Sequence, residues 1–97
     1  MASDVVLLDV SQICNFASYF VICSGESDRQ LRAIQEEIES ALKQAGMQPS
    51  HREGTPDSGW MLLDFGDVIV HIFSVAGREF YQFDDLWNQA VLVVRIQ

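Results

Sequence analysis

The chain has 97 residues, of which 48% are hydrophobic and 21% are charged, and it contains only two prolines and six glycines. This composition predicts one small folded domain over residues 1–97 and excludes a disordered chain. The formal net charge is −8, so we expect neither a membrane surface nor sequence-specific nucleic acid as a direct partner, because both are anionic. The charged partner that best matches this acidity is a basic protein. No hydrophobic run approaches the roughly 20 residues that a membrane-spanning helix needs.

Two hydrophobic runs near the N-terminus predict buried strands. VVLLDV covers residues 5–10 and YFVIC covers residues 19–23, with the loop SQICNFAS between them. The spacing of Cys14 and Cys23 matches no metal site and no redox pair, and we expect Cys23 to be a small buried hydrophobic residue. The first residues, MASDVV, lack the basic segment of a secretory leader. We therefore expect a cytoplasmic protein without disulfides, or an organellar one if the source is eukaryotic.

The hydrophobic period becomes that of a helix between residues 27 and 45. Ser27 followed by Gln30 fits a capping box at the start of this helix, and Gly46 fits the position just after its end. The opposite side is charged, so we expect one buried and one solvated helix face. The hydrophobic positions are Leu31, Ile34, Ile38, Ala41, Leu42 and Ala45.

A polar connection, MQPSHREGTPDSG, follows this helix. We expect a short edge strand around residues 48–53, because the two prolines of the connection exclude a central strand. The next stretch, WMLLDFGDVIVHIF at residues 60–73, predicts a β-hairpin with its turn at Gly66 and Asp67.

The predicted pairing gives this hairpin two different faces, because side chains alternate across a strand. One face is hydrophobic throughout, with Phe65 opposite Val68, Leu63 opposite Val70 and Met61 opposite Ile72. The other, which we call the mixed face, has Trp60 opposite Phe73, Leu62 opposite His71 and Asp64 opposite Ile69. A solvent-exposed face does not favour Trp and Phe, and a buried face does not favour Asp and His without partners. The mixed face is therefore a candidate functional surface.

The C-terminal part predicts a loop, a short helix and a strand. The loop covers SVAGREFYQFDD at residues 74–85, the helix DDLWNQA at residues 84–90, and the strand VLVVRI at residues 91–96. With the elements before them, these predict a mixed β-sheet of roughly four to six strands with helices covering much of it. The predicted fold class is α/β (α+β).

Catalytic patterns are scarce in this chain. SGESDRQ at residues 24–30 opens a helix but lacks the spaced glycines and the Lys of a phosphate loop. Asp64 and Asp67 are three residues apart across a turn, whereas two carboxylates that bind one metal from a single strand need a spacing of two. His71 has no nucleophile that the sequence places beside it, and we expect it to be hydrogen-bonded next to the core. We expect no enzyme, no metal site and no cofactor.

Aromatic residues crowd into the C-terminal part together with carboxylates. They are Trp60, Phe73, Phe80, Tyr81, Phe83 and Trp87, with Asp64, Asp84 and Asp85 among them. This mixture is typical of a hydrophobic core, and equally of the aromatic anchors and polar rim of a protein interface. We expect Phe80 and Phe83 in the core, whereas both interpretations remain open for Trp60 and Leu62.

Four stretches of the chain carry a family resemblance. They are VVLLDV, SYFVICSGESDRQLRAI, GWMLLDFGDVIVHIF and REFYQFDDLW, in family order over most of residues 5–87. Together they resemble the ribosomal silencing factors, also called Iojap-related proteins. The resemblance implies a nucleotidyltransferase-like fold without a catalytic motif. It also implies a translational repressor that binds the large ribosomal subunit at its ribosomal protein fourteen and blocks joining of the small subunit when nutrients are short.

The resemblance makes the mixed face of the hairpin the expected contact surface. The first candidates are Trp60, Leu62 and Asp64, and the second are Tyr81, Asp85 and Trp87. One alternative is a small nucleotidyltransferase-like enzyme that uses Asp64, Asp67 or His71. The other is a self-associating domain whose mixed face forms a homodimer when the protein is free.

Overall fold

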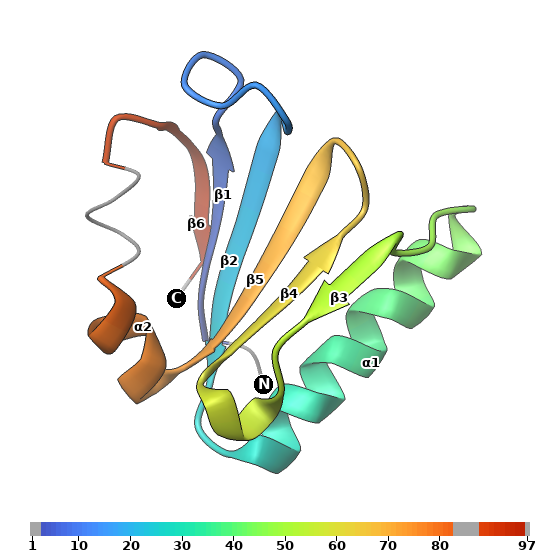
Figure 1. Ribbon diagram of the computed structural model, residues 1–97, viewed down its shortest axis with the longest axis vertical. Helices are drawn as coiled ribbons and strands as arrows, with labels where there is room; N and C mark the ends of the chain where they lie inside the picture. Colours follow the sequence, from blue (N-terminus) through green and yellow to red (C-terminus); the bar gives the residue numbers. More distant parts are fainter. Residues whose placement is uncertain (1–2, 83–87, 97) are drawn as a thin grey trace.

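A mixed sheet of six strands forms the centre of the computed structural model, which describes residues 3–82 and 88–96 (Figure 1). The strands lie in the order β3-β4-β5-β2-β1-β6. They are β1 (Ser3–Asp9), β2 (Tyr19–Gly25), β3 (His51–Glu53), β4 (Trp60–Asp64), β5 (Val68–Ser74) and β6 (Val91–Ile96). The central neighbours β2 and β5 run parallel, and the other four pairs are antiparallel. The predicted α/β class with a mixed sheet is confirmed.

The helix α1 (Asp28–Gln44) follows β2 and begins where the sequence predicts it. Ser27 Oγ accepts a hydrogen bond from the Gln30 backbone N–H at 3.1 Å, while the Gln30 side-chain oxygen accepts one from the Glu26 N–H at 2.6 Å. The predicted N-cap is therefore confirmed, with the second bond of the capping box displaced by one residue. At the other end, Gly46 has a φ of +87°, a left-handed conformation that glycine adopts without strain.

The helix α1 covers one face of the sheet, on which it closes a hydrophobic core (Figure 1). Leu31 and Ile34 project from the helix into this core and are buried. The core residues are Cys23, Leu31, Ile34, Met61, Leu63, Val70 and Ile72. They include the inner residues of the uniformly hydrophobic hairpin face, and the predicted burial of Cys23 is confirmed.

A second core occupies the opposite face of the sheet. Phe20, Ile22, Ile69 and Phe73 contribute to it from the central strands β2 and β5. The full cluster is Val6, Leu8, Val10, Ala17, Phe20, Ile22, Ile69 and Phe73. The parallel strands β2 and β5 are therefore buried on both faces, which is the usual situation of parallel strands.

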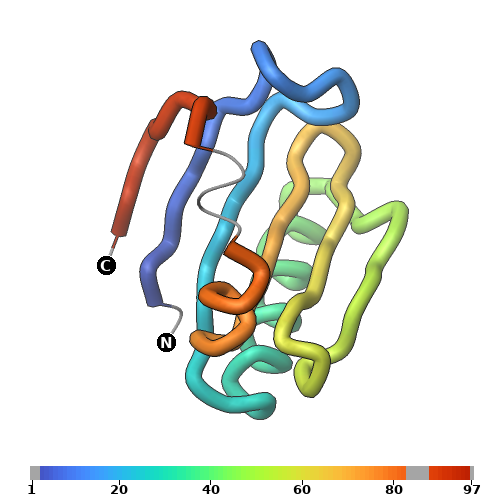
Figure 2. The backbone as a smooth tube through the Cα atoms, turned by 60° about the vertical axis from the view of Figure 1, so that its left-hand side comes forward, coloured from blue at the N-terminus to red at the C-terminus, as the bar shows by residue number. Residues whose placement is uncertain are grey.

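A second helix, α2 (Val75–Tyr81), lies on the side of the sheet opposite α1, as Figure 2 shows. The prediction of a loop over residues 74–85 is therefore wrong for residues 75–81. Ser74 Oγ caps the helix by accepting from the Gly77 N–H at 2.8 Å. Gly77 is a poor helix former, but a Cβ at this position would come within 2.2 Å of the Gly59 carbonyl oxygen. The close contact with Gly59 therefore requires glycine at position 77, and this glycine lowers the helical propensity of the segment, which is why the sequence did not predict the helix.

The orientation of α2 also shows that the core assignment of Phe80 is wrong. The Phe80 side chain is 79% exposed, because Gly77, Arg78 and Tyr81 occupy the inward side of this short helix. Phe83 and residues 84–87 of the helix predicted at 84–90 lie outside the described residues, and the described residues 88–90 form a turn instead of a helix. Among the helices of the described ranges, none is long and hydrophobic enough to cross a membrane.

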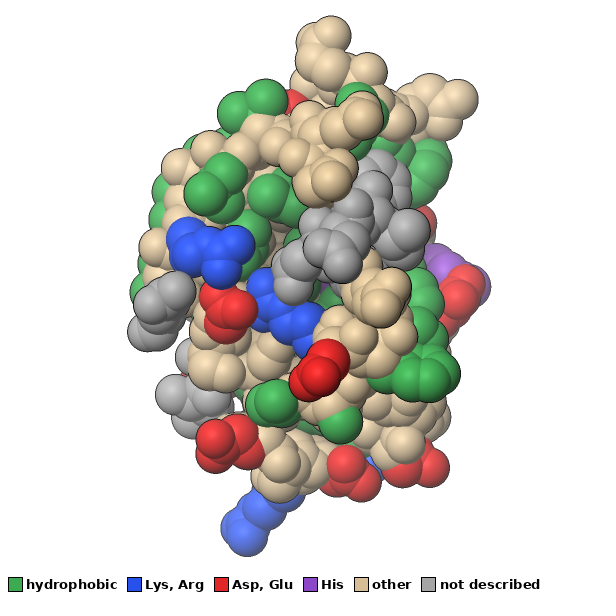
Figure 3. Space-filling model, turned by 90° about the vertical axis from the view of Figure 1, so that its left-hand side faces the viewer, with side chains coloured by type: hydrophobic (Ala, Val, Ile, Leu, Met, Phe, Trp, Pro, Cys, Tyr) green, Lys and Arg blue, Asp and Glu red, His purple; other side chains and the backbone are tan. Residues whose placement is uncertain are grey.

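The strand β6 confirms the strand propensity of residues 91–96 and reveals its partner. It pairs antiparallel with β1, with Leu7 opposite Val94 and Val6 opposite Arg95. It is one of the two edge strands of the sheet, and all of its side chains are exposed. Figure 3 shows hydrophobic side chains on this side of the molecule.

Candidate protein-binding site

The hairpin of β4 and β5 has the register that the sequence predicts. The cross-strand pairs are Met61–Ile72 and Leu63–Val70 on the α1 side, and Trp60–Phe73, Leu62–His71 and Asp64–Ile69 on the other. The Phe65 N–H donates to the Val68 carbonyl oxygen at 2.9 Å, and Gly66 takes the left-handed φ of +91° that the turn requires. The mixed face therefore exists as predicted.

This mixed face is buried along β5 and partly exposed along β4. Phe73 is 0% exposed and belongs to the second core, and His71 is 3% exposed with its ring centroid 4.7 Å from that of the core residue Phe20. Trp60 and Leu62 pack against the same core from its margin and are only partly buried. Trp60 and Leu62 therefore contribute to the core, and each keeps an accessible outer side. Their interpretation as interface residues stays a prediction.

Aromatic contacts hold Trp60 in one position. Its ring stacks on Phe73, with centroids 5.6 Å apart and an interplanar angle of 14°. Tyr81 reaches the same indole from α2, with centroids 5.0 Å apart, and also contacts Phe73 at 6.1 Å. Each aromatic pair adds roughly 0.5–1.5 kcal/mol beyond the area that it buries. The three rings form a rigid group at the margin of the core.

His71 orients the indole of Trp60. The Trp60 Nε1–H donates a hydrogen bond to His71 Nδ1, with the two nitrogen atoms 3.2 Å apart. An indole N–H can only donate, so Nδ1 accepts and the neutral imidazole carries its proton on Nε2. Burial lowers the pKa of His71 to about 4, so the ring is neutral at pH 7. The expectation of a hydrogen-bonded histidine beside the core is confirmed, and its role is to fix the donor of Trp60.

A pocket of about 160 Å³ opens beside this aromatic group. It is lined by Glu53, Gly54, Ser58, Trp60, Leu62 and Tyr81. The structure thus brings together three of the predicted site residues, Trp60, Leu62 and Tyr81. Glu53 joins them because β3 pairs with β4 so that Glu53 lies opposite Leu62 and shares its face. The sequence predicts the edge strand but not its register, which is why Glu53 was missed.

The remaining predicted residues do not line the pocket. Asp64 lies on the mixed face beyond Leu62, and its carboxylate accepts from the Gly66 N–H at 2.7 Å. The Asp67 carboxylate accepts from Ser18 Oγ at 2.8 Å. Asp64 thus stabilises the hairpin turn, and Asp67 connects the turn to the residue before β2. Asp85 and Trp87 lie outside the described residues. Within residues 3–82 and 88–96, no three His, Cys, Asp or Glu side chains come together as a metal site.

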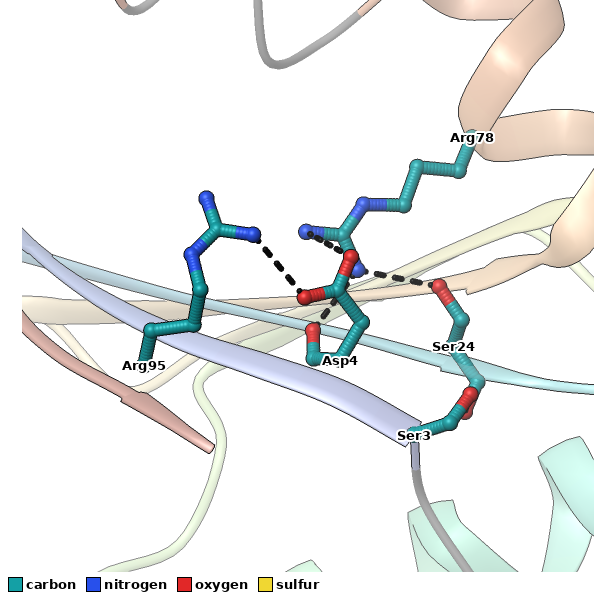
Figure 4. Close-up of polar contacts among 5 residues, drawn as sticks. All are labelled: Ser3, Asp4, Ser24, Arg78 and Arg95. Atoms are coloured by element: carbon teal, nitrogen blue, oxygen red, sulfur yellow. Dashed lines mark hydrogen bonds and ion pairs between the residues drawn. The ribbon is translucent and has the colours of Figure 1, made fainter. Parts of the chain in front are cut away.

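Arg78 connects α2 to the sheet through polar contacts (Figure 4). Arg78 Nη1 donates to the Asp4 carbonyl oxygen at 2.7 Å and to Ser24 Oγ at 3.0 Å. The Asp4 carboxylate lies 3.5 Å from Arg78 Nη2 and 3.1 Å from Arg95 Nη1. These contacts connect α2 to β1, β2 and β6. Sequence reasoning missed them because Asp4 and Ser24 lie 74 and 54 residues from Arg78 along the chain.

Comparison with known protein families shows the family of this chain. Residues 1–97 match the family model described as ribosomal silencing factor during starvation. The chain belongs to this family. It is 41% identical over 91 residues to the ribosomal silencing factor RsfS of Bacillus subtilis, a match that covers 94% of this chain and 77% of that protein. It is 32% identical over 89 residues to the chloroplastic protein Iojap of Zea mays, covering 92% of this chain and 39% of that protein.

Solved structures agree with this family assignment. A Chromobacterium violaceum crystal structure matches with a TM-score of 0.84 and 32% identity, over 90% of this chain and 72% of that one. A Bacillus halodurans crystal structure matches with a TM-score of 0.81 and 33% identity, over 96% of this chain and 84% of that one. The resemblance drawn from the sequence is confirmed, and with it a role as a ribosomal silencing factor that represses translation.

Proposed function

We propose that this ribosomal silencing factor binds the large ribosomal subunit at its ribosomal protein fourteen and so blocks joining of the small subunit under nutrient limitation. The observation that carries the proposal is the accessible margin of the mixed face, where Trp60, Leu62 and Tyr81 line one pocket. Trp and Tyr beside a hydrophobic residue are typical of the energetic centre of a protein interface. Repression then requires no catalysis, because a bound protein excludes the incoming subunit by occupying its place.

The rigidity of the aromatic group supports this proposal. Trp60 is stacked on Phe73 and donates to His71, so its rotamer is set before any partner arrives. Immobilising a side chain on binding costs roughly 0.5–1.5 kcal/mol. A residue that is already fixed avoids most of this cost, and its contact area then contributes more fully to affinity.

Charge supports a basic ribosomal protein as the partner. The chain carries a net charge of −8, and Glu53 and Asp64 lie on the same side of the sheet as Trp60 and Leu62. Opposite charges accelerate association, and added salt weakens this effect. We therefore expect affinity for the ribosome to fall as ionic strength rises, and the protein to reside with its ribosomes in the bacterial cytoplasm or in an organelle.

The proposal is tested by sedimenting the purified protein with isolated large and small ribosomal subunits. We expect it to sediment with the large subunit alone and to reduce the joining of the two subunits. Leu62→Ser should reduce both effects, because Leu62 lies in the pocket. Leu92→Ser is the matched control, since Leu92 is an exposed leucine on β6. Sedimentation with neither subunit, or with the small subunit only, contradicts the proposal.

A further inference from the structure

The pocket at the β3–β4 edge has a wall that only glycine can form. Gly54 has a φ of +83°, and a Cβ at this position would lie 2.0 Å from the Trp60 carbonyl oxygen. Ser58 Oγ lies 2.9 Å from the same carbonyl oxygen and 2.7 Å from that of Thr55. The loop between β3 and β4 is thus held against the backbone of Trp60. Part of the pocket wall is therefore formed by backbone atoms of this loop as well as by side chains.

Glu53 gives this pocket a negative charge at its edge. The Glu53 carboxylate lies 2.6 Å from His51 Nε2, and its side chain remains 66% exposed, so a donor from another molecule can reach it. His51 lies on the same strand and the same face, two residues earlier, and the contact orients the carboxylate. An acid beside two aromatic rings attracts a cation, because the faces of Trp and Tyr are also electronegative.

The size and shape of the pocket select among cations. Its volume of about 160 Å³ is close to the roughly 150 Å³ cavity that accepts a benzene-sized molecule. A guanidinium group is flat, stacks on aromatic rings and donates two parallel hydrogen bonds to one carboxylate. The ammonium group of lysine is a compact, strongly hydrated charge that forms no such stack. The combination of Trp60, Tyr81 and Glu53 therefore fits arginine better than lysine.

We propose that this pocket receives an arginine side chain of the ribosomal partner, stacked against Trp60 and Tyr81 and paired with the carboxylate of Glu53. This inference rests on the proposed function and gives it a chemical anchor. Leu62 and the aromatic rings supply contact area, and Glu53 supplies selectivity for a partner that presents arginine. Arginine is, with tryptophan and tyrosine, among the residues that most often dominate the affinity of a protein interface.

The first experiment measures binding of Glu53→Gln and Glu53→Lys to isolated large ribosomal subunits. We expect affinity to fall about tenfold for the Gln variant, which loses a charge-assisted bond, and by at least about a hundredfold for the Lys variant, which places a cation against a cation. Glu36→Lys on the exposed face of α1 changes the net charge by the same amount as Glu53→Lys and should bind almost normally. Equal affinities of Glu53→Lys and Glu36→Lys overturn the inference while the proposed function stands.

A second experiment needs no ribosome. The wild-type protein is titrated with N-acetyl-arginine methylamide, and separately with the lysine analogue, while the NMR signal of the Trp60 indole N–H is followed. We expect a saturable shift with the arginine compound, a smaller one with the lysine compound, and loss of the preference in Glu53→Gln. The same response to both compounds, or none to either, overturns the inference. If the arginine response appears but wild-type protein binds no subunit, the proposed function fails and the pocket assignment survives.

Discussion

The two faces of the β4–β5 hairpin come from the same strands but meet different neighbours. The α1 face is covered by a long helix, and Met61, Leu63, Val70 and Ile72 are buried there without polar groups. The opposite face lies next to the short helix α2, and burial declines from Phe73 on β5 to Leu62 on β4. A margin of this kind favours side chains that pack on one side and present a polar group or open area on the other.

This difference explains why hydrophobic exposure alone does not identify a binding surface. The strand β6 also exposes hydrophobic residues, such as Leu92 and Ile96. At the margin of the mixed face, in contrast, a fixed indole, a tyrosine and a carboxylate converge on one pocket. Convergence of rigid aromatic and polar groups is the stronger indication of recognition.

The largest effect on stability is expected on the α1 face. Leu63 is 1% exposed, so Leu63→Ala should lower the free energy of unfolding by about 3 kcal/mol, through lost burial and the cavity left behind. Urea denaturation measures this change. Ribosome binding per folded molecule should stay close to wild type. If binding of the folded fraction falls as strongly as in Leu62→Ser, the two hairpin faces are not functionally separate.

Trp60→Ala should affect binding more than folding. Truncating an aromatic anchor costs on the order of 2 kcal/mol or more in binding, whereas the stability loss should be smaller because Trp60 lies at the margin of the core. Affinity for isolated large subunits and urea denaturation give the two values. Trp60→Phe keeps a ring for stacking and should lie between wild type and Trp60→Ala. Unfolding of Trp60→Ala would assign Trp60 to the core and move the contact surface elsewhere.

His71 should make the mixed face sensitive to acid. Its pKa of about 4 in the folded protein lies below the ordinary value of 6.5, so the unfolded chain binds a proton at a higher pH than the native one. The stabilising contribution is therefore complete above pH 6.5 and is lost as the pH falls from 6.5 towards 4. Linkage gives a loss of about 2 kcal/mol between pH 7 and pH 5.

The measurement for His71 is urea denaturation at pH 7 and pH 5, with His71→Gln as the matched variant. The Gln side-chain oxygen can still accept from the Trp60 indole but does not titrate. The exposed His51 and the carboxylates are present in both proteins, so the difference between them isolates His71. Parallel pH profiles of wild type and His71→Gln would show that His71 is not held neutral by burial.

Local signals explain which parts of the fold could be predicted. The N-cap at Ser27, the turn at Gly66 and the alternation along the hairpin each depend on neighbouring residues, and all three are confirmed. The helix α2 was missed because Gly77 has a low helical propensity. The glycine is needed for a close contact with Gly59, which the local sequence does not indicate. A tertiary contact overrides propensity there.

Long-range contacts explain which parts of the candidate site could not be predicted. Trp60, Leu62 and Tyr81 were identified from residue type and resemblance, and the structure places them around one pocket. Glu53 enters this pocket only through the pairing of β3 with β4, and a single sequence does not fix the register of an edge strand. The contacts of Arg78 with Asp4 and Ser24 depend equally on the assembled sheet.

The smallest expected effect comes from a pair of neighbouring aromatic residues on α2. Tyr81 lines the pocket and contacts Trp60 at 5.0 Å, whereas Phe80 is 79% exposed and touches Tyr81 edge-on. Tyr81→Ala should weaken binding to large subunits about tenfold, or about 1.4 kcal/mol. Phe80→Ala should leave stability within about 0.5 kcal/mol of wild type, because it removes an exposed side chain. A loss of affinity with Phe80→Ala that equals the loss with Tyr81→Ala would extend the contact surface beyond the pocket, onto the outer side of α2.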